Sequence, residues 1–336
     1  MLLVHHRDYD FELPDLGGER GSLHEFDGAR ASRALALHRQ RFGPVPVLSA
    51  EPASDEALAR VHDRGYLREL ADPARRPFLC AELMDQPAAA GANPDELERH
   101  YLAPMRLATG GTLQATRWLL GRSERTAARP PVAVNLSGGY HHAGPARGGG
   151  FCAWNDLALA AELAVREHGA ARILCVDLDA HQGDGTARCF AALTERLGGS
   201  AEPSLRLELL DLFNEAIWPG DTESRARTTW PVPLPDGTDA EAYLARLDEG
   251  LDRALDDLTP PDLVLYNAGS DVLRGDPLGR MDLDLDAVTE RDRRVLAAAR
   301  AVGAPLLATA SGGYTELSHR ALASLVGSAL DAVSRS

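Results

Sequence analysis

Short apolar runs alternate with longer amphipathic segments along the whole chain of 336 residues. Most of the short runs are nearly continuous, which is typical of strands that helices cover on both faces. The longer segments carry apolar residues at helical spacing. The predicted strands are 2–6, 45–49, 132–137, 172–179, 205–212, 262–269 and 305–313. The predicted helices are 29–41, 97–120, 155–168, 240–258, 286–302 and 318–333.

This alternation predicts the fold class. Strand–helix–strand units connect through right-handed crossovers, so we expect an α/β fold with a parallel sheet flanked by helices. No repeat, low-complexity tract or long Gly/Ser linker divides the sequence, which predicts a single domain over 1–336. Thr238 and Glu241 have the spacing of a capping box at the start of the helix over 240–258. The Pro- and Ala-rich segment 73–94 fits no pattern and is expected to be an excursion.

Charge and composition limit the kinds of binding partner and the cellular location that we expect. The net charge of −15 argues against nucleic-acid binding, which needs clustered positive charge, and all 35 basic residues are arginines. The four cysteines form no CxxC pair, and the N-terminus lacks the apolar core of a signal peptide. No apolar run reaches the roughly 18 residues that span a bilayer. We expect a cytoplasmic protein without a membrane partner, and the oligomeric state is left open.

Polar clusters follow four of the predicted strands. They are NLSGGYHHAG, DLDAHQGDG, NAGSD and ASGGY. In open parallel sheets, ligands bind beyond the carboxyl ends of the strands. The four clusters are therefore expected to meet in one crevice.

The second cluster has the composition of a metal site. Asp177, Asp179 and His181 share one side of an extended chain, where buried charges need compensation. Asp and His are suitable zinc ligands, and Asp271 in NAGSD is the best candidate for a further ligand. Two carboxylates and one imidazole would leave a coordination position for water, as catalytic sites do. Fe(II) or Mn(II) would also suit this set, and a hydrogen-bonded Asp–His pair is the structural alternative.

The other clusters supply groups for proton transfer. His141 and His142 lie in a glycine-rich loop and could act as base and acid in metal-assisted hydrolysis, each oriented by one of Asp177 and Asp184. A solvated loop is the alternative for the two histidines. Tyr314 could donate a hydrogen bond to a carbonyl oxygen, although a tyrosine that closes a turn would give the same GGY sequence.

Taken together, these residues resemble the metal-dependent histone deacetylase family within the arginase–deacetylase fold, nearly end to end. The segments SLHEFDGARASRAL, VHDRGYLREL, TGGT, DLFNEAIWPGD, NAGSDVLRGDPLG and TASGGY look like its class IV branch. The resemblance implies an eight-stranded parallel sheet and a narrow tunnel that leads an acylated lysine to the metal. Three departures are the LHE sequence at Leu23–Glu25, where His-Pro is common, the YHH sequence at Tyr140–His142, where other ring residues can precede the histidines, and the unmatched segment 73–94.

The resemblance also implies residue roles. Zn²⁺, or Fe²⁺, would bind Asp179, His181 and Asp271, and a structural K⁺ would bind backbone carbonyls around Asp177, Asp179 and His181. His142 with Asp184 would be the general base and acid, His141 with Asp177 the electrostatic partner, and Tyr314 the carbonyl-polarising group. Gly150, Phe151 and Trp218 match tunnel-lining positions.

Four functions follow from these observations. The first is removal of acyl groups from lysine Nε of a peptide or protein, with a preference for long fatty-acyl chains implied by the class IV likeness. The second is deacetylation of a small acylated amine, such as an acetylpolyamine. The third, an arginase-like ureohydrolase, needs two bridged metals, whereas the extra carboxylates here are assigned to the histidines. The fourth, a silent acyl-lysine binder, would need no acid–base set.

Overall fold

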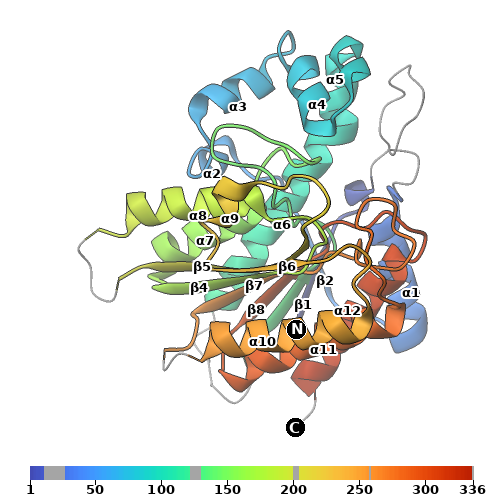
Figure 1. Ribbon diagram of the computed structural model, residues 1–336. Helices are drawn as coiled ribbons and strands as arrows, with labels where there is room; N and C mark the ends of the chain where they lie inside the picture. Colours follow the sequence, from blue (N-terminus) through green and yellow to red (C-terminus); the bar gives the residue numbers. More distant parts are fainter. Residues whose placement is uncertain (11–26, 122–129, 200–203, 257–258, 335–336) are drawn as a thin grey trace.

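In the part of the chain that the structure describes, eight parallel strands form one sheet in the order β2-β1-β3-β8-β7-β4-β5-β6 (Figure 1). The structure is a computed structural model that describes residues 1–10, 27–121, 130–199, 204–256 and 259–334. The strands are β1 (Leu2–His5), β2 (Val47–Ser49), β3 (Val132–Asn135), β4 (Arg172–Asp177), β5 (Arg206–Asn214), β6 (Trp230–Leu234), β7 (Leu263–Asn267) and β8 (Leu306–Thr309). The predicted parallel sheet and fold class are confirmed.

Helices cover both faces of this sheet (Figure 1). One layer consists of α6 (Ala103–Leu120), α7 (Asp156–His168) and α8 (Asp184–Leu197). The other consists of α1 (Arg30–Phe42), α10 (Ala240–Leu255), α11 (Leu285–Ala301) and α12 (Ser318–Ser334). Every residue of β3 and β4 is buried between these layers, which explains their nearly continuous apolar sequences.

A group of short helices lies beyond the α6–α8 layer, at the top of Figure 1. It contains α2 (Asp55–Leu58), α3 (Arg64–Ala71), α4 (Arg76–Met84), the 3-10 helix η3 (Pro87–Gly91), α5 (Pro94–Leu97) and the π-helical turn η4 (Glu98–Leu102). The unmatched segment 73–94 therefore forms α4 and η3, away from the sheet. Two further short elements are η1 (Arg7–Tyr9) and α9 (Thr222–Arg225).

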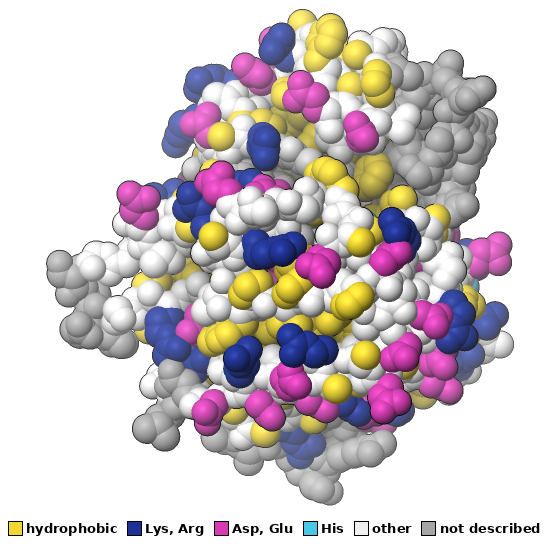
Figure 2. Space-filling model, in the orientation of Figure 1, with side chains coloured by type: hydrophobic (Ala, Val, Ile, Leu, Met, Phe, Trp, Pro, Cys, Tyr) yellow, Lys and Arg dark blue, Asp and Glu magenta, His cyan; other side chains and the backbone are white. Residues whose placement is uncertain are grey.

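Besides the short helices, the apolar pattern missed one strand of the sheet, β6, and one long helix, α8. Strand β6 contains Pro231 and Pro233, which lack backbone N–H groups and therefore suit only the open side of an edge strand. Hydrophobic side chains form a band across the face drawn in Figure 2, at the level of this edge strand. Helix α8 begins inside the polar cluster DLDAHQGDG, whose charges precede its buried Ala187, Phe190 and Leu193.

One predicted helix cap is wrong. Asp239, not Thr238, caps α10, because its carboxylate accepts the Ala242 N–H at 2.9 Å. The Thr238 hydroxyl instead donates to the Pro235 carbonyl at 2.6 Å. The helix predicted over 97–120 is helical throughout, and it contains the π-helical turn η4 just before Pro104, which cannot donate a helical hydrogen bond.

Among the described residues, no helix is both long and apolar enough to cross a bilayer. The four cysteines are buried, and none of them forms a disulfide. The LHE departure at Leu23–Glu25 lies outside the described residues.

Candidate functional site

The carboxyl ends of β3, β8, β7 and β4 lie next to one another, because these four strands are neighbours in the sheet. The four polar clusters follow these strands in the sequence. The sheet order therefore brings together segments that are more than a hundred residues apart, as Ser311 and Gly139 illustrate with a hydrogen bond at 3.2 Å.

Asp179 and His181, from the loop after β4, lie beside Asp271, from the loop after β7. One potential ligand atom of each side chain lies within 4.8 Å of the other two. His181 Nδ1 is 3.1 Å from Asp179 Oδ1 and 2.9 Å from Asp271 Oδ2. Two carboxylates and an imidazole at these separations fit a divalent cation such as Zn²⁺ or Fe²⁺.

Groups from neighbouring loops orient both carboxylates. The Gly312 N–H and the Ser311 hydroxyl each donate to Asp179 Oδ2 at 2.8 Å, and the Ala180 N–H donates to Asp271 Oδ1 at 2.9 Å. A Cβ atom on Gly312 would lie 2.5 Å from Asp179 Oδ2 and 2.8 Å from Asp271 Oδ2. Glycine at this position lets the loop after β8 approach the two carboxylates.

The pKa values of His181 and Asp271 indicate that the two buried carboxylates require a positive charge nearby. Burial alone would lower the pKa of His181, but its hydrogen bonds with Asp179 and Asp271 raise that pKa to about 10. Burial and the charge of Asp179 raise the pKa of Asp271 to about 7. Two carboxylates in a water-poor site require a positive partner. A divalent cation would meet that requirement and replace the proton on His181.

His141 and His142 follow β3, and each has its own carboxylate. Their Nδ1–H groups donate to Asp177 Oδ2 and Asp184 Oδ1 respectively, both at 2.8 Å, since an ionised carboxylate can only accept. Asp177 is the last residue of β4, and Asp184 is the first residue of α8. The two imidazole ring centroids are 3.9 Å apart.

The two imidazoles titrate in opposite directions. Burial would lower the pKa of His141, but the charges of Asp177 and Asp179 raise it to about 10. Burial and the charge of His141 lower the pKa of His142 to about 4, despite its bond to Asp184. At neutral pH, His142 is therefore a neutral imidazole beside an imidazolium. Neighbouring groups whose pKa values are pushed apart are typical of acid–base sites.

Tyr314 follows the glycine pair after β8. Its backbone N–H donates to the buried carboxylate of Asp276 at 2.9 Å, and its ring centroid is 6.3 Å from that of Phe151. Burial and the charges of Asp179 and Asp271 hold the pKa of Tyr314 well above its usual value. The phenol therefore stays protonated and can donate a hydrogen bond.

The expected tunnel residues lie beside the histidines. Gly150 and Phe151 line a cavity of about 60 Å³ that His142, Asp179 and Tyr314 also line. Trp218 is not part of this lining, but its ring packs edge-on against His142 with a centroid distance of 4.7 Å. A Cβ atom on Gly150 would lie 2.3 Å from His142 and 2.7 Å from Trp218. The structure thus brings every predicted site residue to one edge of the sheet.

Asp211 on β5 is a buried carboxylate that the sequence analysis did not assign to the site. It lies in register with Asp177, and its Oδ2 accepts the Gly183 N–H at 3.0 Å. Its Oδ1 is buried without a hydrogen-bond partner among the described residues. Burial and the charge of Asp177 raise its pKa well above the usual value. An unpartnered buried carboxylate oxygen fits a monovalent cation at this point.

Three more residues support the site through hydrogen bonds. The Asn267 side-chain amide donates to Asp177 Oδ1 at 2.9 Å, and the Arg188 guanidinium donates to Asp184 Oδ2 at 2.7 Å. The buried Arg291 of α11 donates to the Gly269 carbonyl at 2.6 Å. Asp211 stands out in sequence as a carboxylate within the apolar run LELLDLF, whereas Arg188 and Arg291 resemble ordinary surface arginines.

Known proteins share this sequence and fold. Residues 24–331 match the family model described as the histone deacetylase domain. Histone deacetylase 2 of Arabidopsis thaliana is 32% identical over 323 residues, covering 96% of this chain and 76% of that protein. An uncharacterised protein of Picosynechococcus sp. is 35% identical over 317 residues, covering 94% of this chain and 93% of that protein. The crystal structure of the HDA15 HD domain matches with a TM-score of 0.71 and 20% identity, covering 99% of this chain and 90% of that chain.

Proposed function

Because the chain belongs to the histone deacetylase family, we propose that it hydrolyses the amide between an acyl group and lysine Nε, with residues 1–336 as one catalytic domain. The observation that carries this proposal is the pair of His141 and His142, each hydrogen-bonded to its own carboxylate at 2.8 Å, beside the Asp179, His181 and Asp271 set. Amide hydrolysis needs an acceptor for a water proton and a donor for the leaving amine. A protein that only recognised acyl-lysine would need neither.

Asp179, His181 and Asp271 would hold the catalytic cation, for which we propose Zn²⁺, with Fe²⁺ as the alternative. When bound, the ion supplies Lewis-acid chemistry that polarises the amide carbonyl and acidifies water. A structural K⁺ near Asp177 is supported by the unpartnered Oδ1 of Asp211.

The side chains of this site would have separate roles in proton transfer and in stabilising the developing negative charge. The Nε2 atom of His142 accepts a proton from the attacking water, while its Nδ1–H stays bonded to Asp184. The same proton passes to the lysine nitrogen as the C–N bond breaks, which releases a carboxylic acid and an amine, and the acid proton then passes to the amine to give a carboxylate and an ammonium group. His141 stays protonated through Asp177 and stabilises the developing negative charge. The Tyr314 phenol donates to the carbonyl oxygen as that charge forms.

Gly150, Phe151 and Trp218 would enclose the methylene stem of the lysine. The Phe151 N–H donates to the Leu83 carbonyl at 2.9 Å, so α4 supports the residue at this entrance. We propose that the acyl group is a long fatty chain, on the strength of the class IV likeness of the sequence. This part of the proposal concerns the substrate and can fail while the reaction stands.

A panel of acyl-lysine peptides from acetyl to myristoyl, assayed with and without a chelator, tests the function. We expect turnover that the chelator abolishes and Zn²⁺ restores, with kcat/KM rising with chain length. Acetylpolyamines in the same panel test the small-amine alternative, which the net charge of −15 favours because it attracts cations. Absence of metal-dependent turnover on every acyl amine would contradict the reaction, whereas an acetyl preference would contradict only the chain-length assignment.

A further inference from the structure

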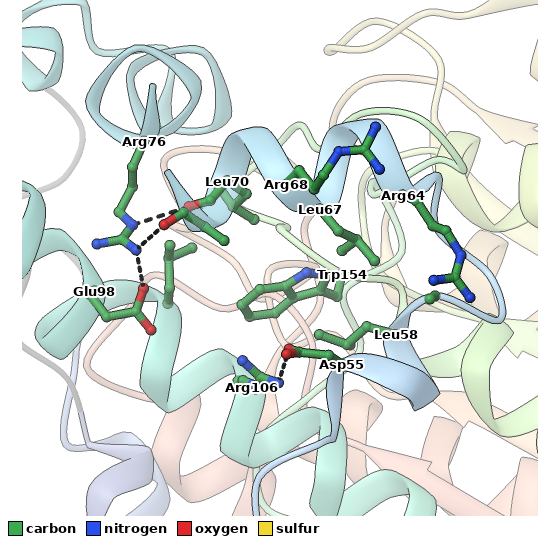
Figure 3. A pocket seen from close by; sticks show the side chains of 13 residues that line it. Asp55, Leu58, Arg64, Leu67, Arg68, Leu70, Arg76, Glu98, Arg106 and Trp154 are labelled. Atoms are coloured by element: carbon green, nitrogen blue, oxygen red, sulfur yellow. Dashed lines mark hydrogen bonds and ion pairs between the residues drawn. The ribbon is translucent and has the colours of Figure 1, made fainter. Parts of the chain in front are cut away.

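A cavity of about 450 Å³ lies between α2, α3, η4 and α6, apart from the candidate site (Figure 3). Charged side chains in its wall are paired with one another, Asp55 with Arg106 and Glu98 with Arg76. The Arg64 and Arg68 side chains, which also border it, point away from its centre (Figure 3). Among the described residues, no unpaired charge therefore faces this cavity, and the charged groups with a further role lie beside His142.

Arg188 on α8 joins two carboxylates that belong to different segments of the site. Its guanidinium donates to Asp184 Oδ2 at 2.7 Å and also to Asp221 Oδ2. Asp184 is the carboxylate that binds His142, and Asp221 caps α9, which lies next to α8 (Figure 1). The side chains of Arg188, Asp184 and Asp221 are at most 20% exposed, so salt and solvent screen these ion pairs less than exposed ones.

The segment that follows β5 carries both Asp221 and Trp218. The Trp218 ring packs against His142, and it also lies against Gly150, where a Cβ atom would come within 2.7 Å of the ring. The Gln182 side chain accepts the Asp221 N–H at 3.0 Å and donates to the Asp221 carbonyl at 2.8 Å. Because Trp218 is 54% exposed, packing holds its ring on one side only. The anchoring of Asp221 therefore limits where that ring can lie.

These contacts form a closed ring around His142. His142 binds one oxygen of Asp184 and Arg188 binds the other, which fixes the plane of this carboxylate. Arg188 also binds Asp221, and the chain leads from there to Trp218, three residues earlier, which packs on His142 again. We propose that Arg188 is a positioning residue that holds His142 and Trp218 in a fixed relation to each other. The planar guanidinium suits this role because its N–H groups point in fixed directions.

The two contacts of Arg188 have different kinetic consequences. The contact with Asp221 places Trp218 beside the lysine stem of the substrate, so its loss raises KM. The contact with Asp184 orients His142, the proton acceptor, so its loss lowers kcat. This assignment rests on the proposed function, since it depends on the roles of Trp218 and His142 in hydrolysis.

The variant D221N separates the two contacts. Asparagine can still accept the N–H groups of Glu223 and Ser224 that start α9, but it removes the ion pair with Arg188. We expect D221N to raise KM for an acyl-lysine peptide about fivefold, with kcat within about twofold of the wild type. R188Q should raise KM similarly and lower kcat about tenfold. The matched control is E223Q, which removes one negative charge from the same helix, where Glu223 pairs with Arg227, and should leave both constants unchanged.

A double-mutant cycle with W218A tests whether D221N acts through the indole ring. In the W218A background, D221N should change KM by less than about twofold. D221N should also change the tryptophan emission of the protein without substrate, and W218A should lose that change. The emission comparison needs no turnover.

An unchanged KM in D221N, or an equal rise in KM with and without Trp218, would overturn the role of Arg188 while the proposed reaction stands. If the wild type hydrolyses no acyl amine, the proposed function fails and the emission comparison decides the placement of Trp218. Identical emission from D221N and the wild type would then overturn this placement as well.

Discussion

His142 and Tyr314 lie in loops beyond the strand ends, so their side chains can be altered without removing a strand pairing. Because His142 supplies the proposed proton acceptor, H142A is expected to lower kcat by about 10²–10⁴. Y314F removes one hydrogen bond to the developing oxyanion and should cost about 10²–10³. The measurement is steady-state hydrolysis of an acyl-lysine peptide. The exposed His168 on α7 provides the control H168A, and near wild-type rates in both site variants would refute the assignment.

His62 is the residue from which we expect a distinct pH dependence of stability. Its ring accepts the Asn155 N–H at Nε2 and donates from Nδ1 to the Gly144 carbonyl, both at 3.0 Å, so only the neutral form satisfies both bonds. Burial lowers its pKa to about 4, from about 6.5 in the unfolded chain. The unfolded state therefore binds the proton first, and stability is lost as the pH falls from about 6.5 to 4, by about 3 kcal/mol.

Urea unfolding of the wild type and of H62Q across this pH range measures the effect. We expect the free energy of unfolding to fall less steeply in H62Q, although its value at pH 7 is lower because the bonds to Gly144 and Asn155 are altered. H168Q, at an exposed histidine, should keep the wild-type slope. Identical slopes in wild type and H62Q would show that the imidazole of His62 is not protected from protonation.

The site residues that are easiest to predict from the sequence are polar side chains in apolar segments, because burying a polar group without a partner is energetically costly. Asp179, His181 and Asp271 are polar groups at the ends of apolar strands, and the structure brings them together. Arg188 and Arg291 gave no such signal, because an arginine on a helix is ordinary until tertiary packing places it against a carboxylate or a carbonyl. Asp211 is also a carboxylate in an apolar run. Its link to the site, however, depends on the pairing of β5 with β4 and on its unpartnered Oδ1, which the sequence does not reveal.

Among the elements, the start of α10 offers a direct test of the corrected cap. The Asp239 carboxylate accepts the Ala242 N–H, so D239A should lower the free energy of unfolding by about 1 kcal/mol. E241A would break the capping box that the sequence suggested, and is expected to cost only a few tenths of a kcal/mol through the helix dipole. Urea denaturation of both variants measures these losses. A larger loss of unfolding free energy in E241A than in D239A would support the capping box instead of the Asp239 cap.

The strands with continuous apolar sequence were the predictable elements, because burial on both faces leaves a direct compositional signal. Strand β6 carries a proline at every second position and pairs on one side only, so its sequence is unlike that of a central strand. The start of α8 is polar because its first residue, Asp184, is turned toward His142. A pattern that depends on burial therefore finds the central strands, including those that end at the site, but misses a proline-rich edge strand and a helix that begins in the polar cluster.

For the whole molecule, the candidate cation would tie together loops from strands that are distant in sequence. The buried carboxylates of Asp179 and Asp271 share the protonated imidazole of His181, and a divalent cation would compensate them more fully. Binding to the folded state alone stabilises it by about 2.7 kcal/mol when free ion is at a hundred times Kd. Stripping the ion with a chelator should therefore lower the Tm by several degrees and abolish turnover together.

Differential scanning calorimetry before and after chelation, followed by titration with Zn²⁺, measures this stabilisation. D271N removes one ligand and its charge, so its Tm should respond far less to either treatment, whereas D239A lies outside the site and should respond as the wild type does. Because Asp271 and Asp179 repel each other in the absence of a cation, D271N should also raise the Tm of the chelated protein relative to the chelated wild type. If the Tm of the wild type does not change on chelation, the carboxylates of the site are compensated by protonated imidazoles and not by a divalent cation.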